Sequence, residues 1–472
     1  MKMPRFFLVA TLLFTACGDD DEVSANDVIS EERTLAVPID EAMELGAGNE
    51  ATLRYFIYAR PSATETLIVH FGGPGSSATE SLADFVTGVP DAVLDRYAVV
   101  GVDEIGISAG TELGCSPIDE TALQGSDTFS MFFADYFAGC ARQELLSQTG
   151  TQRYARDLER VRQALGASEL SFLGYSYGTR VALTYAALFP ERTGRLALDA
   201  VFNPLVPYED FILAQLRAGA AAFDSYFAWC ETEPTCDVSA TDFVELQDAV
   251  DASASDLIAS GYSTLILFVR NQYAWDIVAP VVAAALDSLA ILEDLALDSD
   301  VDESVFLSTV CSDTVPAVDR ETAIATQAAF ESEYAGPFPV RFFGTIAQEV
   351  LEACSVWTAP EPALDFAAAL SAVSSETLII TAIGDTQTPS ALVDSLLDTL
   401  DNEQQVLINE VAHTHAFQEL NACVDRAVND FLLGLPVNAT QCPRTVLEIA
   451  GALSVPSPKY VSNKLRHRFP RF

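Results

Sequence analysis

The chain has 472 residues, half of them hydrophobic, so it is long enough to bury a sizeable core. It carries 25 lysine and arginine residues against 68 acidic ones, and this formal net charge of -43 excludes nucleic acid and anionic lipid surfaces as expected partners. We interpret the charge as an aid to solubility in salty surroundings; the alternative is a negative field that attracts cationic substrates, such as peptides with a free amino terminus.

The N-terminus has the pattern of an export signal. A basic start is followed by an apolar run from Phe6 to Phe14, shorter than the roughly 20 residues needed to span a bilayer. This pattern predicts a signal peptide over residues 1–16. Cys17 resembles the lipid-bearing cysteine of bacterial lipoproteins, so we expect residues 17–32 to form a lipidated acidic tether that anchors the protein to a membrane. The alternative is an ordinary cleaved signal with a chance cysteine.

Strands and helices alternate in residues 33–203, the first part of the predicted core. Apolar runs predict strands at 52–59, 65–71, 96–102, 170–173 and 195–198, and helical spacing predicts a helix at 151–166 and another that ends near residue 188. This alternation indicates βαβ units and therefore a mostly parallel sheet flanked by helices.

Residues 204–374 differ in composition from the preceding part of the chain and are rich in alanine and acidic residues. Helices are expected at 212–222, 243–258 and 281–295, with Pro280 in a first helical turn, and a strand is conceivable only at 264–269. The strand pattern resumes in residues 375–445, with strands at 376–381 and 404–408 and helices at 389–400 and 417–434. We therefore expect one α/β core interrupted by a helical cap, followed by a basic tail over 446–472.

The run Gly174-Tyr175-Ser176-Tyr177-Gly178 joins a predicted buried strand to a predicted helix. This context is typical of a nucleophile elbow, in which glycines permit a sharp turn and the serine hydroxyl stands above the sheet at a helix N-terminus. We predict that Ser176 is the nucleophile. The alternative is a plain turn with a surface serine.

A serine nucleophile needs a base, and the base needs an orienting acid. Asp385 and His413 each follow a predicted strand, so parallel strands would bring them to the same sheet edge as Ser176. We expect His413 to accept the serine proton and Asp385 to orient it. His415 is the rival base, helix capping is the alternative for Asp385, and His70 is expected to support the glycine loop that follows it.

An oxyanion intermediate needs two backbone N–H donors. We predict that one belongs to Tyr177, directly after the nucleophile, and the other to Gly73 in the run from Gly72 to Gly75, since Pro74 has no N–H. The alternative is a plain tight turn.

Eight cysteines remain when Cys17 is set aside, and an even number in an exported chain indicates disulfides. Among the many possible pairings we expect those between sequential neighbours. These are Cys115–Cys140, Cys230–Cys236, Cys311–Cys354 and Cys423–Cys442. With no paired C-x-x-C motifs and only four histidines, we expect neither a metal nor any other cofactor.

These motifs together resemble those of secreted bacterial tripeptidyl and prolyl aminopeptidase-type serine peptidases of the α/β-hydrolase superfamily. The resemblance covers roughly residues 50–445. It is carried by Gly72-Gly73-Pro74-Gly75, Val100 to Asp103 before Cys115, Asp157-Leu158 with Arg162, Ser176 to Thr179, Leu198-Asp199, Cys311 to Asp313, Cys354 with Trp357, Asp385 to Pro389, and His413 upstream of Cys423.

The resemblance implies an α/β-hydrolase fold with a helical cap and a peptidase that releases single residues or short peptides from peptide N-termini. Members of this family bind the substrate ammonium with carboxylates of the cap. Weak candidates here are Glu209, Asp210, Asp313 and Glu352. Peptides are therefore the expected substrates. The other hypotheses are an ester or lactone hydrolase on the same fold and a non-catalytic binding protein.

Overall fold

The computed structural model describes residues 28–46, 48–118, 122–123, 128–253, 255–296, 301–314, 317–333 and 340–443, with backbone alone at 256 and 340–346. The predicted signal peptide, Cys17 and the C-terminal tail over 446–472 lie outside the described residues. Among the described helices, none combines the length and the apolar character needed to cross a bilayer.

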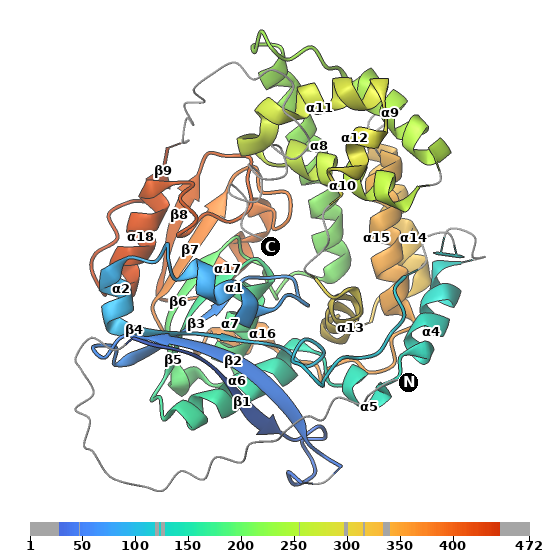
Figure 1. Cartoon of the computed structure of the whole chain (residues 1–472). Helices are drawn as coiled ribbons and strands as arrows, with labels where there is room; N and C mark the ends of the chain where they lie inside the picture. The colour runs from blue at the N-terminus through green and yellow to red at the C-terminus, as the bar shows by residue number, and fades with distance from the viewer. Residues whose placement is uncertain are drawn as a thin grey trace, which may run out of the picture.

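A sheet of nine strands, in the order β1-β2-β4-β3-β5-β6-β7-β8-β9, forms the centre of the fold (Figure 1). The strands are β1 (Ile29–Val37), β2 (Ala51–Ala59), β3 (Glu65–His70), β4 (Tyr97–Val102), β5 (Leu170–Tyr175), β6 (Thr193–Asp199), β7 (Thr377–Ala382), β8 (Glu403–Ile408) and β9 (Gln441–Cys442). β1 and β2 run antiparallel to their neighbours, and every pairing from β4 to β9 is parallel. All six residues of both β5 and β7 are buried, as expected for strands covered on both faces.

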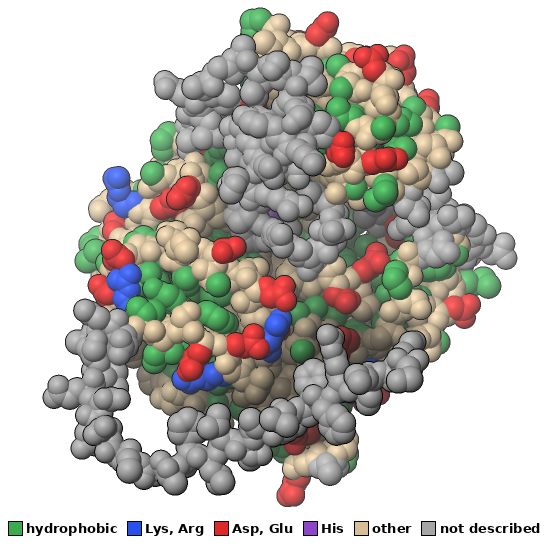
Figure 2. Space-filling view, in the orientation of Figure 1, with side chains coloured by type: hydrophobic (Ala, Val, Ile, Leu, Met, Phe, Trp, Pro, Cys, Tyr) green, Lys and Arg blue, Asp and Glu red, His purple; other side chains and the backbone are tan. Residues whose placement is uncertain are grey.

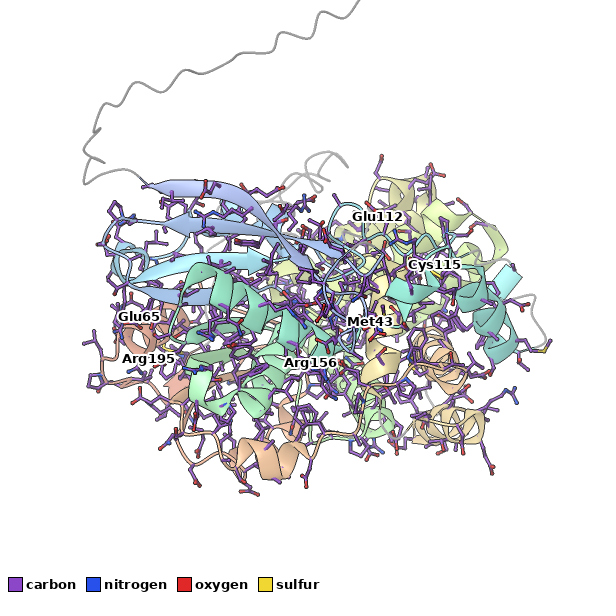
Figure 3. The ribbon with its side chains drawn as sticks, turned by 90° about the horizontal axis from the view of Figure 1, so that it is seen from below. Met43, Glu65, Glu112, Cys115, Arg156 and Arg195 are labelled. Carbon is purple, nitrogen blue, oxygen red and sulfur yellow. A yellow bond between two sulfur atoms is a disulfide. The ribbon has the colours of Figure 1, made fainter. Side chains whose placement is uncertain are left out.

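Helices cover both faces of this sheet. One face packs against α6 (Thr151–Leu165), α7 (Tyr177–Leu188) and α17 (Asp394–Leu397), and the other against α1 (Ala78–Phe85), α2 (Asp91–Arg96) and α18 (Ala422–Leu432). Glu65 begins β3 and Arg195 lies in the first half of β6. Figure 3 places both at the end of the molecule away from the helical region, whereas Cys115 lies beside that region.

The helical region lies between β6 and β7 in the sequence and beyond the carboxyl edge of the sheet in space (Figure 1). Its helices are α8 (Tyr208–Cys230), α9 (Ala240–Ser253), α10 (Asp256–Val269), α11 (Trp275–Asp287), α12 (Ala290–Glu293), α13 (Glu303–Asp313), α14 (Arg320–Glu333), α15 (Val340–Ser355) and α16 (Phe366–Leu370). Most of them share one apolar core, which confirms a mainly helical cap. However, α13 packs with α4 (Phe129–Gly139) and α5 (Gln143–Leu146), and α16 packs on α7, so the core extends into the predicted cap range.

Several expectations for single elements were wrong. The conceivable strand at 264–269 is the end of α10, because a short apolar run fits a buried helix as well as a strand. Pro280 lies inside α11, which begins at Trp275 and whose apolar residues pack in the cap core on both sides of the proline. The expected helix at 389–400 is a 3-10 turn at Ser390–Leu392 followed by the short α17.

The predicted acidic tether over 17–32 is too long at its C-terminal end. β1 begins at Ile29, so residues 29–32 belong to the sheet and pair with residues 56–59 of β2. The first six residues of β1 are exposed, so this edge strand is held there by backbone hydrogen bonds and carries no apolar pattern that would have revealed it.

Four disulfides connect the eight cysteines in the predicted order. They are Cys115–Cys140, Cys230–Cys236, Cys311–Cys354 and Cys423–Cys442. Cys311–Cys354 joins α13 to α15, and Cys423–Cys442 joins α18 to β9 at the edge of the sheet. Disulfides of this kind persist in oxidising compartments and are rare in the cytosol, so they indicate an exported protein.

Candidate active site

Ser176 occupies a strained turn between β5 and α7. Its backbone has φ 53° and ψ -123°, a conformation that non-glycine residues rarely adopt. The surroundings fix this turn, because the Ser176 N–H donates to the Asp199 carbonyl at 2.9 Å and the Thr179 hydroxyl donates to the Ser176 carbonyl at 2.6 Å. A Cβ atom at Gly174 would lie 2.5 Å from the carbonyl oxygen of Gly178, so the elbow needs glycine there.

The imidazole of His413 is paired with the carboxylate of Asp385. The Nδ1 atom of His413 lies 2.9 Å from Oδ2 and 3.0 Å from Oδ1 of Asp385. Burial alone would raise the pKa of Asp385, but His413 and the hydrogen bonds from Thr388 outweigh it and lower that pKa, so the carboxyl stays ionised. Asp385 also accepts the Gln387 N–H at 2.8 Å and the Thr388 N–H at 3.0 Å, so it fixes its own loop, but it does not cap the helical turn at Ser390–Leu392, whose cap residue is Pro389.

His415, the rival base, has a different setting. It is buried, and its Nε2 atom lies 3.0 Å from Oε2 of Glu410. Burial alone would lower the pKa of His415, but its hydrogen bond to Glu410 and the charge of Asp199 outweigh burial and raise that pKa. His413 by contrast keeps 23% of its side chain exposed and turns Nδ1 toward Asp385, which leaves Nε2 as its other ring nitrogen.

The three predicted catalytic residues share one edge of the sheet. Ser176 follows β5, Asp385 lies close after β7 and His413 lies close after β8, and these parallel strands belong to the continuous run β5-β6-β7-β8. Their carboxyl ends therefore lie at the same edge of the sheet, where open α/β sheets place their sites. The helical cap stands beyond this edge (Figure 1).

Asp199 connects the elbow with the loop that carries the base. Its carbonyl accepts the Ser176 N–H, and its Oδ2 accepts the N–H groups of His415 at 2.6 Å and Ala416 at 2.7 Å. Burial raises the pKa of this carboxyl. The sequence drew attention to Asp199 only as the end of a strand and as part of a family motif. The signal for the structural role of Asp199 was its position, because it is an acidic residue at the buried end of β6.

The glycine loop lies directly against the nucleophile. A Cβ atom on Gly72 would come within 3.1 Å of the Cβ of Ser176, and both Gly72 and Gly73 have positive φ angles of 111° and 97°. The Gly72 N–H donates to Nδ1 of His70 at 3.2 Å, and Nε2 of His70 lies 3.0 Å from Glu104. His70 therefore supports the loop, as its position in the sequence suggested. The predicted oxyanion donor Tyr177 is the first residue of α7, where N–H groups have no acceptor within the helix.

Behind the elbow, two acids of the cap region occupy the N-terminus of α6. Asp313 accepts the Thr151 N–H at 2.9 Å, and Glu361 accepts those of Gln152 at 2.8 Å and Arg153 at 2.6 Å. Asp313 also pairs with Arg180 at 2.9 Å. Burial, together with the charge of Asp313, raises the pKa of Glu361 to about 8. No pattern in the sequence pointed to Glu361, because its partners lie more than 200 residues earlier in the chain.

A cavity of about 400 Å³ opens beside this cluster. Its lining includes Tyr177, Arg180, Phe202, Glu209, Asp313 and Glu361.

The four acids considered as binding sites for the substrate ammonium therefore lie in different surroundings. Glu209 and Asp313 line the cavity, but Asp313 is occupied by Thr151, Tyr177 and Arg180. Asp210 is exposed in the first turn of α8, and Glu352 is buried elsewhere, where it accepts the hydroxyl of Ser130 at 2.6 Å. In the part of the chain that the structure describes, no cluster of three or more His, Cys, Asp or Glu residues could hold a metal ion.

Comparisons with known proteins agree with this architecture. A family model for the α/β hydrolase fold matches residues 65–259, and one described as a TAP-like protein matches residues 339–442. The chain is 25% identical over 459 residues to serine protease Hip1 of Mycobacterium tuberculosis, with 86% of each chain covered. It is 24% identical over 455 residues to carboxylesterase B of the same organism, which covers 87% of this chain and 85% of that one.

A third relative is similar over a shorter stretch. The chain is 30% identical over 194 residues to tripeptidyl aminopeptidase of Streptomyces lividans, which covers 36% of this chain and 35% of that one. The first family match includes β3 to β6 and the second includes β7 to β9, so together they take in both halves of the sheet that carries Ser176, Asp385 and His413. The chain belongs to the α/β-hydrolase superfamily.

Proposed function

We propose that this hydrolase is a serine exopeptidase that removes single residues or short peptides from peptide N-termini. The observation that carries the proposal is the strained elbow at Ser176, at the same sheet edge as a His413–Asp385 pair. The backbone of Ser176 at φ 53° favours a catalytic role over a non-catalytic binding protein, because backbone strain of this kind is concentrated at functional sites.

The reaction follows from the roles of these groups. Oγ of Ser176 attacks the scissile carbonyl while His413 takes the hydroxyl proton, and the carboxylate of Asp385 stabilises the imidazolium. The N–H groups of Gly73 and Tyr177 are the proposed donors to the oxyanion. His413 then gives its proton to the leaving amine as the C–N bond breaks, and a water molecule, activated by the same imidazole, releases the acyl group from Ser176.

The substrate class rests on three supports. The C-terminal part of the chain matches the TAP-like family, and two of the relatives are named as a serine protease and a tripeptidyl aminopeptidase. Acidic side chains outnumber basic ones on the face seen in Figure 2, which suits a substrate with a free ammonium group. The similarity to a carboxylesterase favours ester hydrolysis as the second candidate.

Turnover of matched substrates separates the two candidates. We expect aminoacyl or tripeptidyl arylamides with a free amino terminus to be cleaved faster than their N-acetylated forms and faster than short-chain esters. Equal turnover of free and acetylated arylamides, or turnover of esters alone, would favour the ester hydrolase. A fluorophosphonate probe should label the wild type and leave Ser176→Ala unlabelled. Absence of labelling in folded wild-type protein would contradict both candidates.

We also propose that the protein is exported and anchored to a membrane through a lipid on Cys17, with its catalytic domain outside the cytoplasm. The four disulfides support export, and the N-terminal sequence supports the anchor. In a bacterial host, the wild type should incorporate labelled palmitate and sediment with membranes. Cys17→Ala should do neither, and equal sedimentation of both proteins would refute the anchor.

A further inference from the structure

One turn of the cap contacts both loops that carry the catalytic acid and base. This turn, Arg270-Asn271-Gln272-Tyr273, directly follows α10 and includes the first two residues of the 3-10 helix at Gln272–Ala274, and we call it the cap turn. The side-chain oxygen of Asn271 accepts the Tyr273 N–H at 3.1 Å, which fixes its local shape. The sequence offered no sign of it, since its partners lie more than 100 residues further along the chain.

The first contact of the cap turn is with the acid loop. Nε of Arg270 donates to the hydroxyl of Thr386 at 2.8 Å, and Nη2 donates to the Thr386 carbonyl at 2.9 Å and to Oε1 of Gln387 at 3.2 Å. Thr386 is buried and directly follows Asp385. A planar guanidinium with several donors in a fixed arrangement therefore sets the path of the backbone next to the catalytic carboxylate.

The second contact is with the base loop. The Gln272 N–H donates to the Val411 carbonyl at 2.7 Å, and the Val411 N–H donates to Oε1 of Gln272 at 3.2 Å. These bonds are made two residues before His413.

Tyr273 adds a third link. Its hydroxyl donates to Oε2 of Glu410 at 2.6 Å, and that same oxygen lies 3.0 Å from Nε2 of His415. The Tyr273 ring packs with Ala412 and Leu420, so the cap turn holds the base loop on both sides of His413.

We infer that Arg270, Gln272 and Tyr273 are positioning residues of the cap, which hold Asp385 and His413 in the correct orientation relative to each other. The inference rests on the proposed serine chemistry but not on the peptide substrate. The catalytic pair sits on two loops that follow separate strands. The cap turn contacts both loops, so a displaced cap turn would disturb the 2.9 Å contact between His413 and Asp385. Small displacements of such a catalytic pair from its productive geometry greatly reduce the reaction rate.

The test compares Arg270→Gln with its conservative partner Arg270→Lys. We expect Arg270→Gln to lower kcat by about 10- to 100-fold with KM changed by less than about threefold, as loss of alignment predicts. Its rate of labelling by a small fluorophosphonate should fall by a similar factor, because that reaction needs an activated serine and few substrate contacts. Arg270→Lys, which keeps the charge and a donor, should recover part of both rates.

A matched control is Arg217→Gln, since Arg217 lies in the same cap and pairs with Glu333 at an exposed position. We expect its kcat and labelling rate to equal those of the wild type. Tyr273→Phe removes one hydroxyl and keeps the ring, and it replaces Arg270→Gln as the test if that variant lowers the melting temperature too far. It should reduce kcat and the labelling rate by about 3- to 10-fold.

The outcomes separate the two proposals. If folded Arg270→Gln and Tyr273→Phe both keep kcat and labelling within about twofold of the wild type, the positioning role is wrong. If the variants raise KM and leave the labelling rate unchanged, the cap turn acts on substrate binding and the inference is also wrong. A wild type that is not labelled at all would refute the serine hydrolase itself.

Discussion

Replacing Asp385 by asparagine tests the catalytic assignment with little change in shape. Oδ1 of Asp385 accepts the N–H groups of Gln387 and Thr388, and an asparagine oxygen can keep both of these bonds. The amide nitrogen then takes the place of Oδ2, which lies 2.9 Å from Nδ1 of His413. This nitrogen donates a hydrogen bond to Nδ1, whereas Oδ1, 3.0 Å from Nδ1, already accepts two backbone N–H groups, so the substitution favours the tautomer with the imidazole proton on Nε2.

A His413 protonated on Nε2 cannot accept the proton of Ser176. We therefore expect kcat of Asp385→Asn to fall by about 10³- to 10⁴-fold, which corresponds to about 4 to 5.5 kcal/mol of transition-state stabilisation. The loss of stability should be small, because the backbone hydrogen bonds of the loop remain. Arylamide turnover and thermal unfolding, measured on the same preparation, give the two quantities.

A matched control for this substitution is Asp319→Asn. Asp319 also accepts a backbone N–H, that of Thr322 at 2.7 Å, but it lies exposed at the start of α14. Its kcat should equal that of the wild type. A folded Asp385→Asn that keeps more than about a tenth of the wild-type kcat would show that Asp385 does not set the tautomer of the base.

Three further predictions concern the base, a buried acid and a disulfide. His413→Ala should lose turnover by several orders of magnitude, whereas His415→Ala should mainly lower the melting temperature; the reverse pattern would make His415 the base. The pKa of Glu361 is raised to about 8 from an ordinary 4.5. Between these pH values the folded state binds more protons than the unfolded state, so the free energy of unfolding should fall as pH rises from about 5 to 8. That slope, measured by thermal unfolding, should be shallower in Glu361→Gln, and equal slopes would contradict the assignment. Replacing Cys423 and Cys442 by serine opens a loop with a sequence separation of 19 and should reduce the free energy of unfolding by about 3 kcal/mol in a urea titration, and an unchanged midpoint would refute this.

The sequence predicted the features whose signals are local. β5 is a buried apolar run that leads into a glycine-flanked serine, and both signals lie within nine residues. The strand ends before Asp385 and His413 were visible for the same reason. By contrast β1 was not predicted, because an exposed edge strand is held mainly by backbone pairing.

Contacts across the chain could not be predicted in this way. Arg270 meets Thr386 across 116 residues, and no periodicity or spacing in the sequence connects them. Glu352 was a candidate for substrate binding because it is acidic, and only its burial against Ser130 shows that it is occupied. Charge alone therefore cannot separate a binding carboxylate from one that satisfies the protein's own donors.

The capping of α6 has a consequence for the way the domain is assembled. The first three N–H groups of this helix find their acceptors on Asp313 and Glu361, between 162 and 209 positions later in the chain. A ribosome releasing this polypeptide would finish the N-terminal half of the sheet well before those carboxylates emerge. The start of α6 therefore has only water as a hydrogen-bond partner until the later residues arrive. Because the two parts of the chain complete each other, they should melt together as a single cooperative unit.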